Sequence, residues 1–232
     1  MISFAVTLFI LMPFLTVEIL CNEAKRFSTL ESQHLEPSLY GVTDGKAVGT
    51  YLEQKFKNYL AINYNFVLGN SASGIDFPEL LVDMKVTRIK QPQSSCPFKS
   101  ARQKIYGLGY SLIAFVYEKI DDLTNQTALL NILHTVYVDA AKTADFQTTR
   151  GIRNILDNNG NEDDLIAFMF DRNLPVDEIE AGNIAREIMI NPPSQGFLTI
   201  SNALQWRLQY RRIIELANKE EGILAVYQAN NI

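Results

Sequence analysis

The sequence has little of the residues from which metal-thiolate sites, disulfide frameworks and histidine-based catalytic sites are built. Among 232 residues there are two cysteines, Cys21 and Cys96, and two histidines, His34 and His134. Two distant cysteines argue against a disulfide framework and against a zinc site built from cysteines. Two histidines argue against a histidine-rich metal site and weaken the case for a Ser-His or Cys-His triad. The 12 glycines and 8 prolines are too few for a collagenous or low-complexity chain.

The composition is that of an ordinary globular protein. Apolar residues make up 47% and charged residues 20%, which is enough for a substantial core. The length predicts one elaborated domain or two small ones. The net charge is −5, so any binding to nucleic acid must use a local basic surface.

The N-terminal segment is apolar and admits three interpretations. Residues 1–17 carry no charge, and residues 5–15 are almost entirely apolar. This run is short for a membrane span, and Glu18 interrupts it. It is a weak signal or anchor, a buried helix, or a non-native extension from an upstream start codon. We treat residues 1–25 as an apolar N-terminal extension, and we expect a cytoplasmic protein without stable membrane association.

The remaining chain divides into a mixed α/β part and a helical part. Up to residue 140, the periodicity predicts helices over Asp44–Leu60 and Phe98–Leu108, with strands over Ile62–Leu68, Leu80–Ile89, Ser111–Tyr117 and Ile132–Val138. This order predicts a mixed β-sheet core flanked by helices, over residues 40–140. Residues 141–232 are expected to form a helical region, with helices over Leu165–Arg172, Val176–Met189 and Ser201–Lys219.

The strand over Leu80–Ile89 carries a carboxylate and a lysine on one face. Asp83 and Lys85 lie two residues apart, and Asp76 precedes Asp83 by seven residues. Carboxylates that converge at a strand can hold Mg²⁺, and an adjacent lysine can stabilise charge that develops on a phosphate. The alternative is that Asp83 and Lys85 form a solvated outer face of an edge strand.

These residues resemble the PD-(D/E)xK nuclease motif. Asp76, Asp83 and Lys85 match it, with Ile75 in place of the leading proline. The segment DFPELLVDMK is similar to the short-spaced motif of the mismatch-repair strand-nicking endonuclease and its restriction-enzyme relatives. GKAVGTYLE resembles the helix that carries an additional acid in those enzymes, here Glu53, and ARQK places Lys104 at the position of a further basic residue.

The resemblance implies a restriction-endonuclease-like fold and a Mg²⁺-dependent type II restriction endonuclease that leaves 5′-phosphate ends. It implies that Asp76, Asp83, Glu53 and the Met84 carbonyl hold the metal, while Lys85 positions the attacking water. Glu53 and Lys104 also have structural alternatives to an active-site role. Glu53 could pair with Lys57 at i,i+4 on a solvated helix face, and Lys104 could be a surface lysine.

Basic residues are concentrated in acid-free stretches of this acidic chain, as a surface that follows phosphates would require. The candidates for DNA binding are Arg88, Lys90, Arg102, Arg150, Arg153, Arg207 and Arg211. The alternative is that Trp206 and Tyr210 face the core and the nearby arginines solvate the opposite face.

We therefore expect the partners to be double-stranded DNA, a second copy of the chain in a homodimer, and a cognate DNA methyltransferase as genetic partner. The alternatives are a strand-nicking repair enzyme, a non-catalytic DNA-binding protein on the same fold, and an envelope or secreted protein whose motif is coincidental.

Overall fold

The computed structural model describes residues 12–69, 74–95, 100–201 and 207–229. Its main sheet has five strands: β1 (Leu35–Glu36), β2 (Val82–Arg88), β4 (Ser111–Asp122), β5 (Thr127–Val138) and β8 (Ile223–Gln228). The order is β1-β5-β4-β2, and β8 also pairs with β5. β2 runs parallel to β4, whereas the other pairs are antiparallel. The mixed α/β core predicted from the sequence is confirmed.

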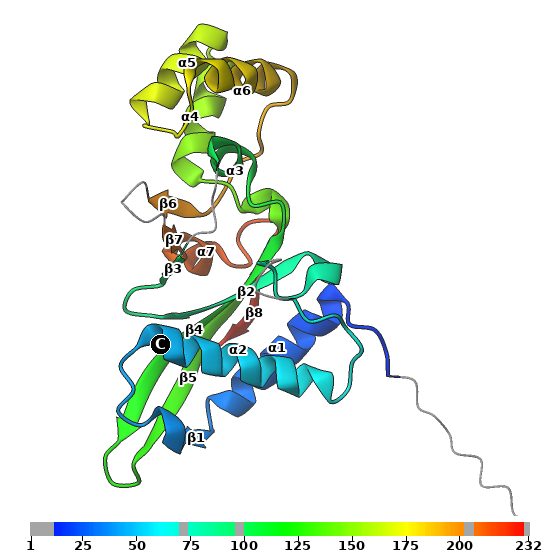
Figure 1. The fold of residues 1–232 in the computed structure, drawn as a ribbon, viewed down its shortest axis with the longest axis vertical. Coiled ribbons are helices and arrows are strands. Elements are labelled where there is room, and N and C mark those ends of the chain that lie inside the picture. The colour runs from blue at the N-terminus through cyan, green and yellow to red at the C-terminus, as the bar shows by residue number, and fades with distance from the viewer. Residues whose placement is uncertain (1–11, 70–73, 96–99, 202–206, 230–232) are drawn as a thin grey trace, which may run out of the picture.

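Two long helices pack against the main sheet (Figure 1). α1 (Val17–Glu31) begins at Thr16, whose side chain accepts from the Ile19 N–H. α2 (Gly45–Ala61) begins at Asp44, whose carboxylate accepts from the N–H groups of Lys46 and Ala47. Both helices direct their apolar stripes into one core, which includes Phe27, Phe56 and Phe115. α2 is the expected helix over Asp44–Leu60, and it carries Glu53.

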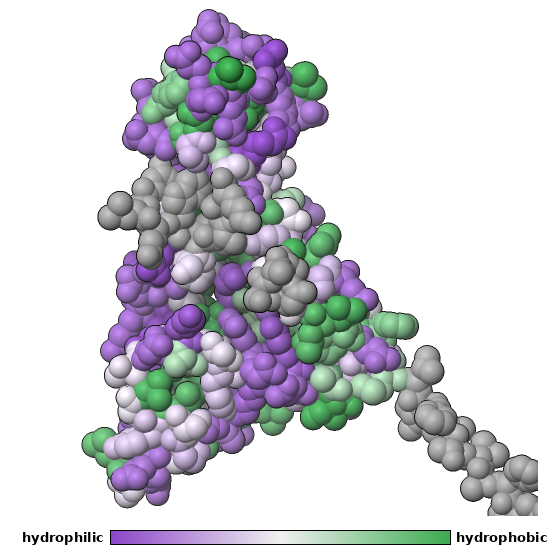
Figure 2. All heavy atoms as spheres, viewed as in Figure 1, coloured by the Kyte–Doolittle hydropathy of each residue, from purple (hydrophilic) through white to green (hydrophobic). Residues whose placement is uncertain are grey.

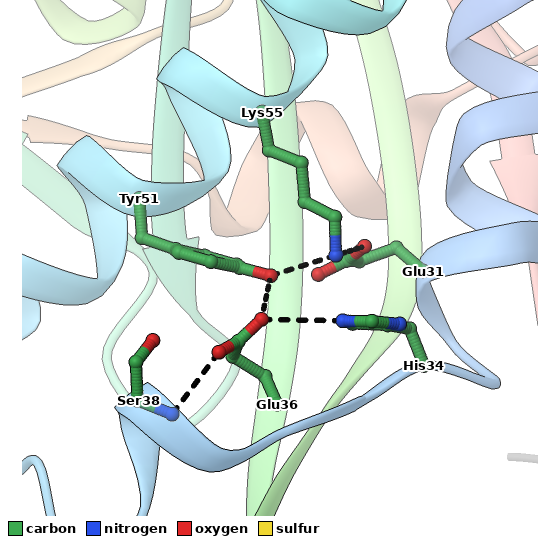
Figure 3. Close-up of polar contacts among 6 residues, drawn as sticks. All are labelled: Glu31, His34, Glu36, Ser38, Tyr51 and Lys55. Carbon is green, nitrogen blue, oxygen red and sulfur yellow. Dashed lines mark hydrogen bonds and ion pairs between the residues drawn. The ribbon is translucent and has the colours of Figure 1, made fainter.

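A polar network fixes α2 relative to α1 and β1 (Figure 3). The Lys55 ammonium lies 2.8 Å from the Glu31 carboxylate and donates to the Tyr51 hydroxyl at 2.7 Å. The Tyr51 hydroxyl donates in turn to Glu36 at 2.8 Å. Glu36 also accepts from the Ser38 N–H, in the 3₁₀ turn η1 (Pro37–Leu39), and its pKa falls to about 2 because of these hydrogen bonds. The network holds the helix that carries Glu53 in one position over the sheet.

Four helices form the end of the molecule farthest from β1 (Figure 1). They are α3 (Ala101–Tyr106), α4 (Phe146–Asp157), α5 (Glu162–Asp171) and α6 (Glu178–Ile190), and they share a separate apolar cluster that contains Ile105, Ile152 and Leu165. The surface of this end is mostly hydrophilic (Figure 2). The helices expected over Leu165–Arg172 and Val176–Met189 correspond to α5 and α6, whereas α4 was not predicted.

A second, smaller sheet lies between the helical end and the main sheet. It contains β3 (Gln93–Ser95), β7 (Arg207–Gln209) and β6 (Thr199–Ser201) in the order β3-β7-β6, and α7 (Arg211–Leu216) follows β7. One side of this sheet contributes Ile200 and Leu208 to an apolar cluster shared with Leu112 and Val138 of the main sheet. The small sheet is thus packed against the end of β4 and β5. The 3₁₀ turn η3 (Ala140–Lys142) follows β5.

Three sequence predictions are wrong in their extent. Ile62–Leu68 is no strand, because its pairing consists of a single bridge from Asn65 to Phe14. A single helix was expected over Ser201–Lys219. In the described part of this range, the chain instead forms the last residue of β6, the whole of β7 and the short helix α7. The region after residue 140 is mainly helical to Ile190, but beyond it the described residues form β6, β7, the short helix α7 and β8, which returns to the main sheet.

The N-terminal boundary also needs correction. Residues 17–25 belong to α1, where Leu20 and Ala24 are completely buried, so they are part of the fold and not of an extension. Residues 1–11 lie outside the described residues. Over the ranges that the structure describes, no helix is both long and apolar enough to cross a membrane.

Candidate active site

The site lies at the free edge of β2, the outermost strand of the main sheet. The 3₁₀ turn η2 (Pro78–Leu80) precedes β2 and is closed by a bridge between Phe77 and Val82. Leu81 adopts a left-handed backbone conformation, with φ 51°, to complete this tight reversal. The reversal folds Asp76 back onto the strand, where its Oδ2 accepts from the Met84 N–H at 2.9 Å. This geometry explains the short spacing between Asp76 and Asp83.

Two lysines face the paired carboxylates. Lys85 Nζ lies 2.6 Å from Asp83 Oδ2, and Lys57 Nζ lies 2.5 Å from Asp76 Oδ1. Asp83 is only 2% exposed. The structure thus brings Asp76, Asp83 and Lys85 together as the motif predicts. The structure adds Lys57, which the sequence suggests only as a partner of Glu53. Its place one helical turn after Glu53, on the same face of α2, is the feature of the sequence that could have identified it.

The carboxyl groups perturb one another. Burial raises the pKa of Asp83 to about 6; neighbouring Asp76 adds to this rise, while Lys85 opposes it. Burial also acts on Asp76, but hydrogen bonds with Asp83, Lys57 and the Met84 N–H outweigh it and lower its pKa. The pKa of Glu53 rises to about 7, first through burial and then through the charge of Asp76. Such a group of carboxyls is stabilised by a cation that lets all of them ionise.

Two adjoining hollows open over this edge. The smaller, of about 350 Å³, is lined by Glu53, Lys57, Asp76, Asp83 and Lys85, among others. The larger, of about 740 Å³, is a groove between the start of α2, the strand β2 and the strand β3. Glu53 and Lys85 line both hollows. A chain lying in the groove would therefore reach the carboxylates.

The residues present fit a magnesium ion. Asp83 Oδ2 is buried, and the ion pair with Lys85 Nζ at 2.6 Å balances its charge without the ring of donors that would fully satisfy it. Within the described residues, no group of three or more His, Cys, Asp or Glu side chains is arranged to hold a metal. Mg²⁺ needs only one or two protein carboxylates, because it keeps several waters. Asp76 and Asp83 meet that requirement.

Lys104 is not brought to the carboxylates, contrary to the role that the motif implied. Its side chain is 5% exposed on α3, and it lines neither hollow. The buried face of this short helix, with Ala101 and Ile105, packs into the apolar cluster of the helical end. The helix therefore turns Lys104 into the protein, where it does not line either hollow.

The basic residues fall into two groups. Arg88, Lys90 and Arg207 line the groove. The Arg88 guanidinium is held there by bonds to the Thr43 carbonyl at 2.8 Å and to the Tyr117 hydroxyl at 3.2 Å.

The remaining candidates lie elsewhere. Arg102 forms an ion pair with Glu187 of α6 and so joins α3 to the helical end. Arg150, Arg153 and Arg211 are exposed but do not line the groove. Tyr210 is completely buried, as the core interpretation predicts, whereas Trp206 lies outside the described residues.

Comparisons with known proteins identify the family of this chain. The family model described as type II restriction enzyme NspV matches residues 14–225. The chain is 74% identical over 219 residues to the type II restriction enzyme NspV of Nostoc sp. (strain ATCC 29411 / PCC 7524), covering 94% of this chain and 100% of that protein. The tetrameric restriction endonuclease SfiI, solved with cognate DNA, shares 11% identity and a TM-score of 0.40 over 88% of this chain and 78% of its own. The family match over most of the sequence shows that the chain belongs to the NspV family of type II restriction enzymes and is a site-specific deoxyribonuclease.

Proposed function

We propose that this restriction enzyme hydrolyses DNA with Mg²⁺ at the free edge of β2, where Asp76, Asp83 and the Met84 carbonyl hold the ion. The observation that supports this most strongly is the convergence of two carboxylates, Asp76 and the 2% exposed Asp83, at one edge of β2. In a parallel strand the N–H and C=O of one residue point the same way. Since the Met84 N–H faces Asp76, its carbonyl faces the same free edge.

The side chains around the ion have separate roles in this proposal. Bound Mg²⁺ would supply Lewis-acid stabilisation of charge on the phosphate. Lys85, already against Asp83, orients the attacking water by hydrogen bonding and places a positive charge beside the scissile phosphate. Glu53 contributes through water, or holds a second ion. Attack on phosphorus that expels the 3′-oxygen leaves the 5′-phosphate ends expected from the resemblance.

The groove accounts for the grip on double-stranded DNA. Arg88, Lys90 and Arg207 supply positive charge to the lining of the groove, and phosphate contacts of this kind position a duplex. Arg150, Arg153 and Arg211 remain candidates for contacts outside the groove, and Arg102 would first have to leave Glu187.

Cutting both strands of a short palindrome calls for two copies related by a twofold axis, so we propose a homodimer. A nuclease of this kind in the cytoplasm would also need a cognate DNA methyltransferase to protect the host DNA.

A cleavage assay tests the metal and the site together. Unmethylated plasmid and phage DNA are incubated with the full chain in Mg²⁺ or in EDTA. Discrete fragments with 5′-phosphate ends are expected only with Mg²⁺, and Asp83→Asn should abolish them.

Asp171→Asn is the matched control, because this exposed carboxylate ends α5 far from the site. It should cut like the wild type. Cleavage that persists in EDTA, or in a folded Asp83→Asn variant, would refute the proposed site.

A further inference from the structure

The small sheet has one polar face built from six side chains. The pairing register places Thr199, Gln209 and Gln93 in one row across β6, β7 and β3, and Ser201, Arg207 and Ser95 in a second row. The residues between the rows are Ile200, Leu208 and Ser94. Since successive side chains in a strand point to opposite faces, the two polar rows share the face opposite Ile200 and Leu208.

The opposite face is fixed by packing. Ile200 is 4% exposed, Leu208 is completely buried, and the Ser94 hydroxyl bonds the buried Tyr210 hydroxyl at 2.5 Å. A slip of one residue would bury the polar rows instead, so the register is strongly specified. The polar face is consequently presented in a fixed register, as a reading surface requires.

One edge of this face borders the catalytic groove. Gln93, Ser95 and Arg207 line the same hollow as Glu53 and Lys85, as does Ser94 between them, and the face continues beyond the hollow through Gln209, Thr199 and Ser201. An ordinary solvated sheet face could lie anywhere on the molecule, whereas this one lies beside the carboxylate site. A duplex with its scissile phosphate at Lys85 would therefore place neighbouring base pairs against these side chains.

The chemistry of the face suits bases better than phosphates alone. Its six residues are two amides, three hydroxyls and one guanidinium, with no carboxylate to repel DNA. In the major groove, arginine pairs with guanine O6 and N7, glutamine pairs with adenine N6 and N7, and serine or threonine can bond several bases. A narrow β-ribbon fits into that groove.

We propose that the polar face of the β3-β7-β6 sheet enters the major groove and reads base edges, with Arg207 on a guanine and Gln93 and Gln209 on adenines. The inference rests on the proposed cleavage at the β2 edge, because it is this site that fixes where the duplex lies. It makes the small sheet the determinant of sequence specificity.

The first test compares cleavage of the cognate site with cleavage of duplexes that carry single base-pair changes. The site itself is found by sequencing the ends produced by wild-type enzyme on phage DNA. Arg207→Lys, Gln93→Ala and Gln209→Ala should each lower kcat/KM on the cognate duplex by about 5- to 150-fold. Each should lose discrimination at one base pair of the half-site and keep it at the others.

Matched controls are Gln147→Ala and Arg186→Lys, exposed residues of α4 and α6 outside the groove lining. Both should leave cleavage and discrimination unchanged. A uniform loss on all duplexes with unchanged discrimination would refute base reading and indicate phosphate contact or structural support. Absence of Mg²⁺-dependent cleavage by the wild type is a different result, which refutes the proposed function itself.

A second test probes the contacted atom directly. Replacing a guanine of the site by 7-deazaguanine removes its N7 acceptor, and 7-deazaadenine does the same for adenine. Wild-type cleavage should be slower on the guanine-modified duplex than on the unmodified one. For Arg207→Lys, the difference in rate between these two duplexes should be much smaller. The glutamine variants should show the same reduced difference on the adenine-modified duplex. Equal slowing of wild type and variant at every position would overturn the assignment, even if a variant were less stable.

Discussion

Lys57 and Lys85 each place an ammonium group against one of the two paired carboxylates, but they differ in where they come from. Lys85 belongs to β2 itself, whereas Lys57 reaches across from α2 to Asp76. Lys57 thus occupies a side of Asp76 from which a divalent cation could approach. A positive charge at this place opposes the entry of metal by Coulomb repulsion and by competing for Asp76.

Removing this charge should tighten metal binding. Lys57→Met is expected to lower the dissociation constant for Mg²⁺, without DNA, by on the order of 5-fold, the effect of about 1 kcal/mol for a partly exposed ion pair. Titration calorimetry measures it. Lys55→Met is the control, because Lys55 lies on the same helix but pairs with Glu31. Weaker binding in Lys57→Met would mean that this lysine organises the site for the metal.

Glu53 makes the metal-free protein sensitive to pH. Its pKa rises from 4.5 to about 7 on folding, so the folded state binds a proton that the unfolded state has released. The resulting stability is complete below about pH 4.5 and is lost as the pH rises through 7. Asp83 adds a similar loss at lower pH, since its pKa rises from 3.8 to about 6.

Urea unfolding in EDTA at several pH values between 5 and 8 measures this dependence. The free energy of unfolding of the wild type should fall with rising pH, and Glu53→Gln should fall less steeply. Glu162→Gln, an exposed residue in the first turn of α5, should follow the wild type. Parallel curves for Glu53→Gln and wild type would show that Glu53 ionises normally.

At the scale of elements, α1 is the segment whose role the sequence obscured. Its residues Leu20, Ala24 and Phe27 are buried in the main core, and the Ser28 hydroxyl bonds that of Thr135 in β5 at 2.7 Å. The apolar run before α1 continues into it, so the sequence shows no boundary between the run and the apolar face of the helix. Residues 1–25 were therefore predicted to form one extension. Only the packing partner separates residues that belong to the core from those that precede it.

Two truncations test the boundary at α1. Deletion of residues 1–12 should leave cooperative unfolding and DNA cleavage intact. Deletion of residues 1–25 should abolish both, because burial of Leu20 alone contributes roughly 1.5–3 kcal/mol and stability is typically about 5–15 kcal/mol. Thermal unfolding followed by circular dichroism gives the comparison. A shorter chain without residues 1–25 that unfolds cooperatively at the wild-type temperature would show that α1 is dispensable.

Elements with strong periodicity were predictable, whereas short ones were not. α2 and β2 follow helical and alternating patterns, and β4 begins with a continuous apolar run, so each lies where its pattern predicts. The patterns miss the partly exposed ends of the hairpin, since β4 (Ser111–Asp122) and β5 (Thr127–Val138) each extend five residues beyond the strands expected over Ser111–Tyr117 and Ile132–Val138. The three-residue strands of the small sheet carry too few positions to define a period. Tyr210 is buried, as the core interpretation predicts, but it precedes the short helix α7 and does not lie within the long helix that its spacing suggested.

The same distinction applies to the candidate site. Asp76, Asp83 and Lys85 could be found because strand alternation and sequence spacing suffice to place them. Lys57 and the exclusion of Lys104 depend on how α2 and α3 pack, which is a property of the whole fold. Motif spacing therefore predicts the groups on one strand better than those that neighbouring helices contribute.

At the scale of the whole molecule, the paired carboxylates Asp76 and Asp83 of one chain lie next to the groove along β2. One such site cuts one strand in one orientation, and the second strand runs antiparallel to the first. A twofold-related partner, as proposed above, would supply a second site in the matching orientation. The homodimer is thus expected from the geometry of the substrate, and its mass should be about twice 26.2 kDa by ultracentrifugation.

Mixed dimers connect this assembly to the cleavage of each strand. Wild-type chain co-expressed with an excess of Asp83→Asn, and purified through different tags on the two copies, contains one active and one inactive site. On supercoiled plasmid with a single recognition site, such dimers should accumulate nicked circles, because the inactive half leaves its strand intact. The control is a mixture of wild type with Asp171→Asn, which should produce linear DNA. Linear DNA from the Asp83→Asn mixture, without nicked circles, would mean that a single active site cuts both strands in turn, and the dimer would then serve recognition and not the second cut.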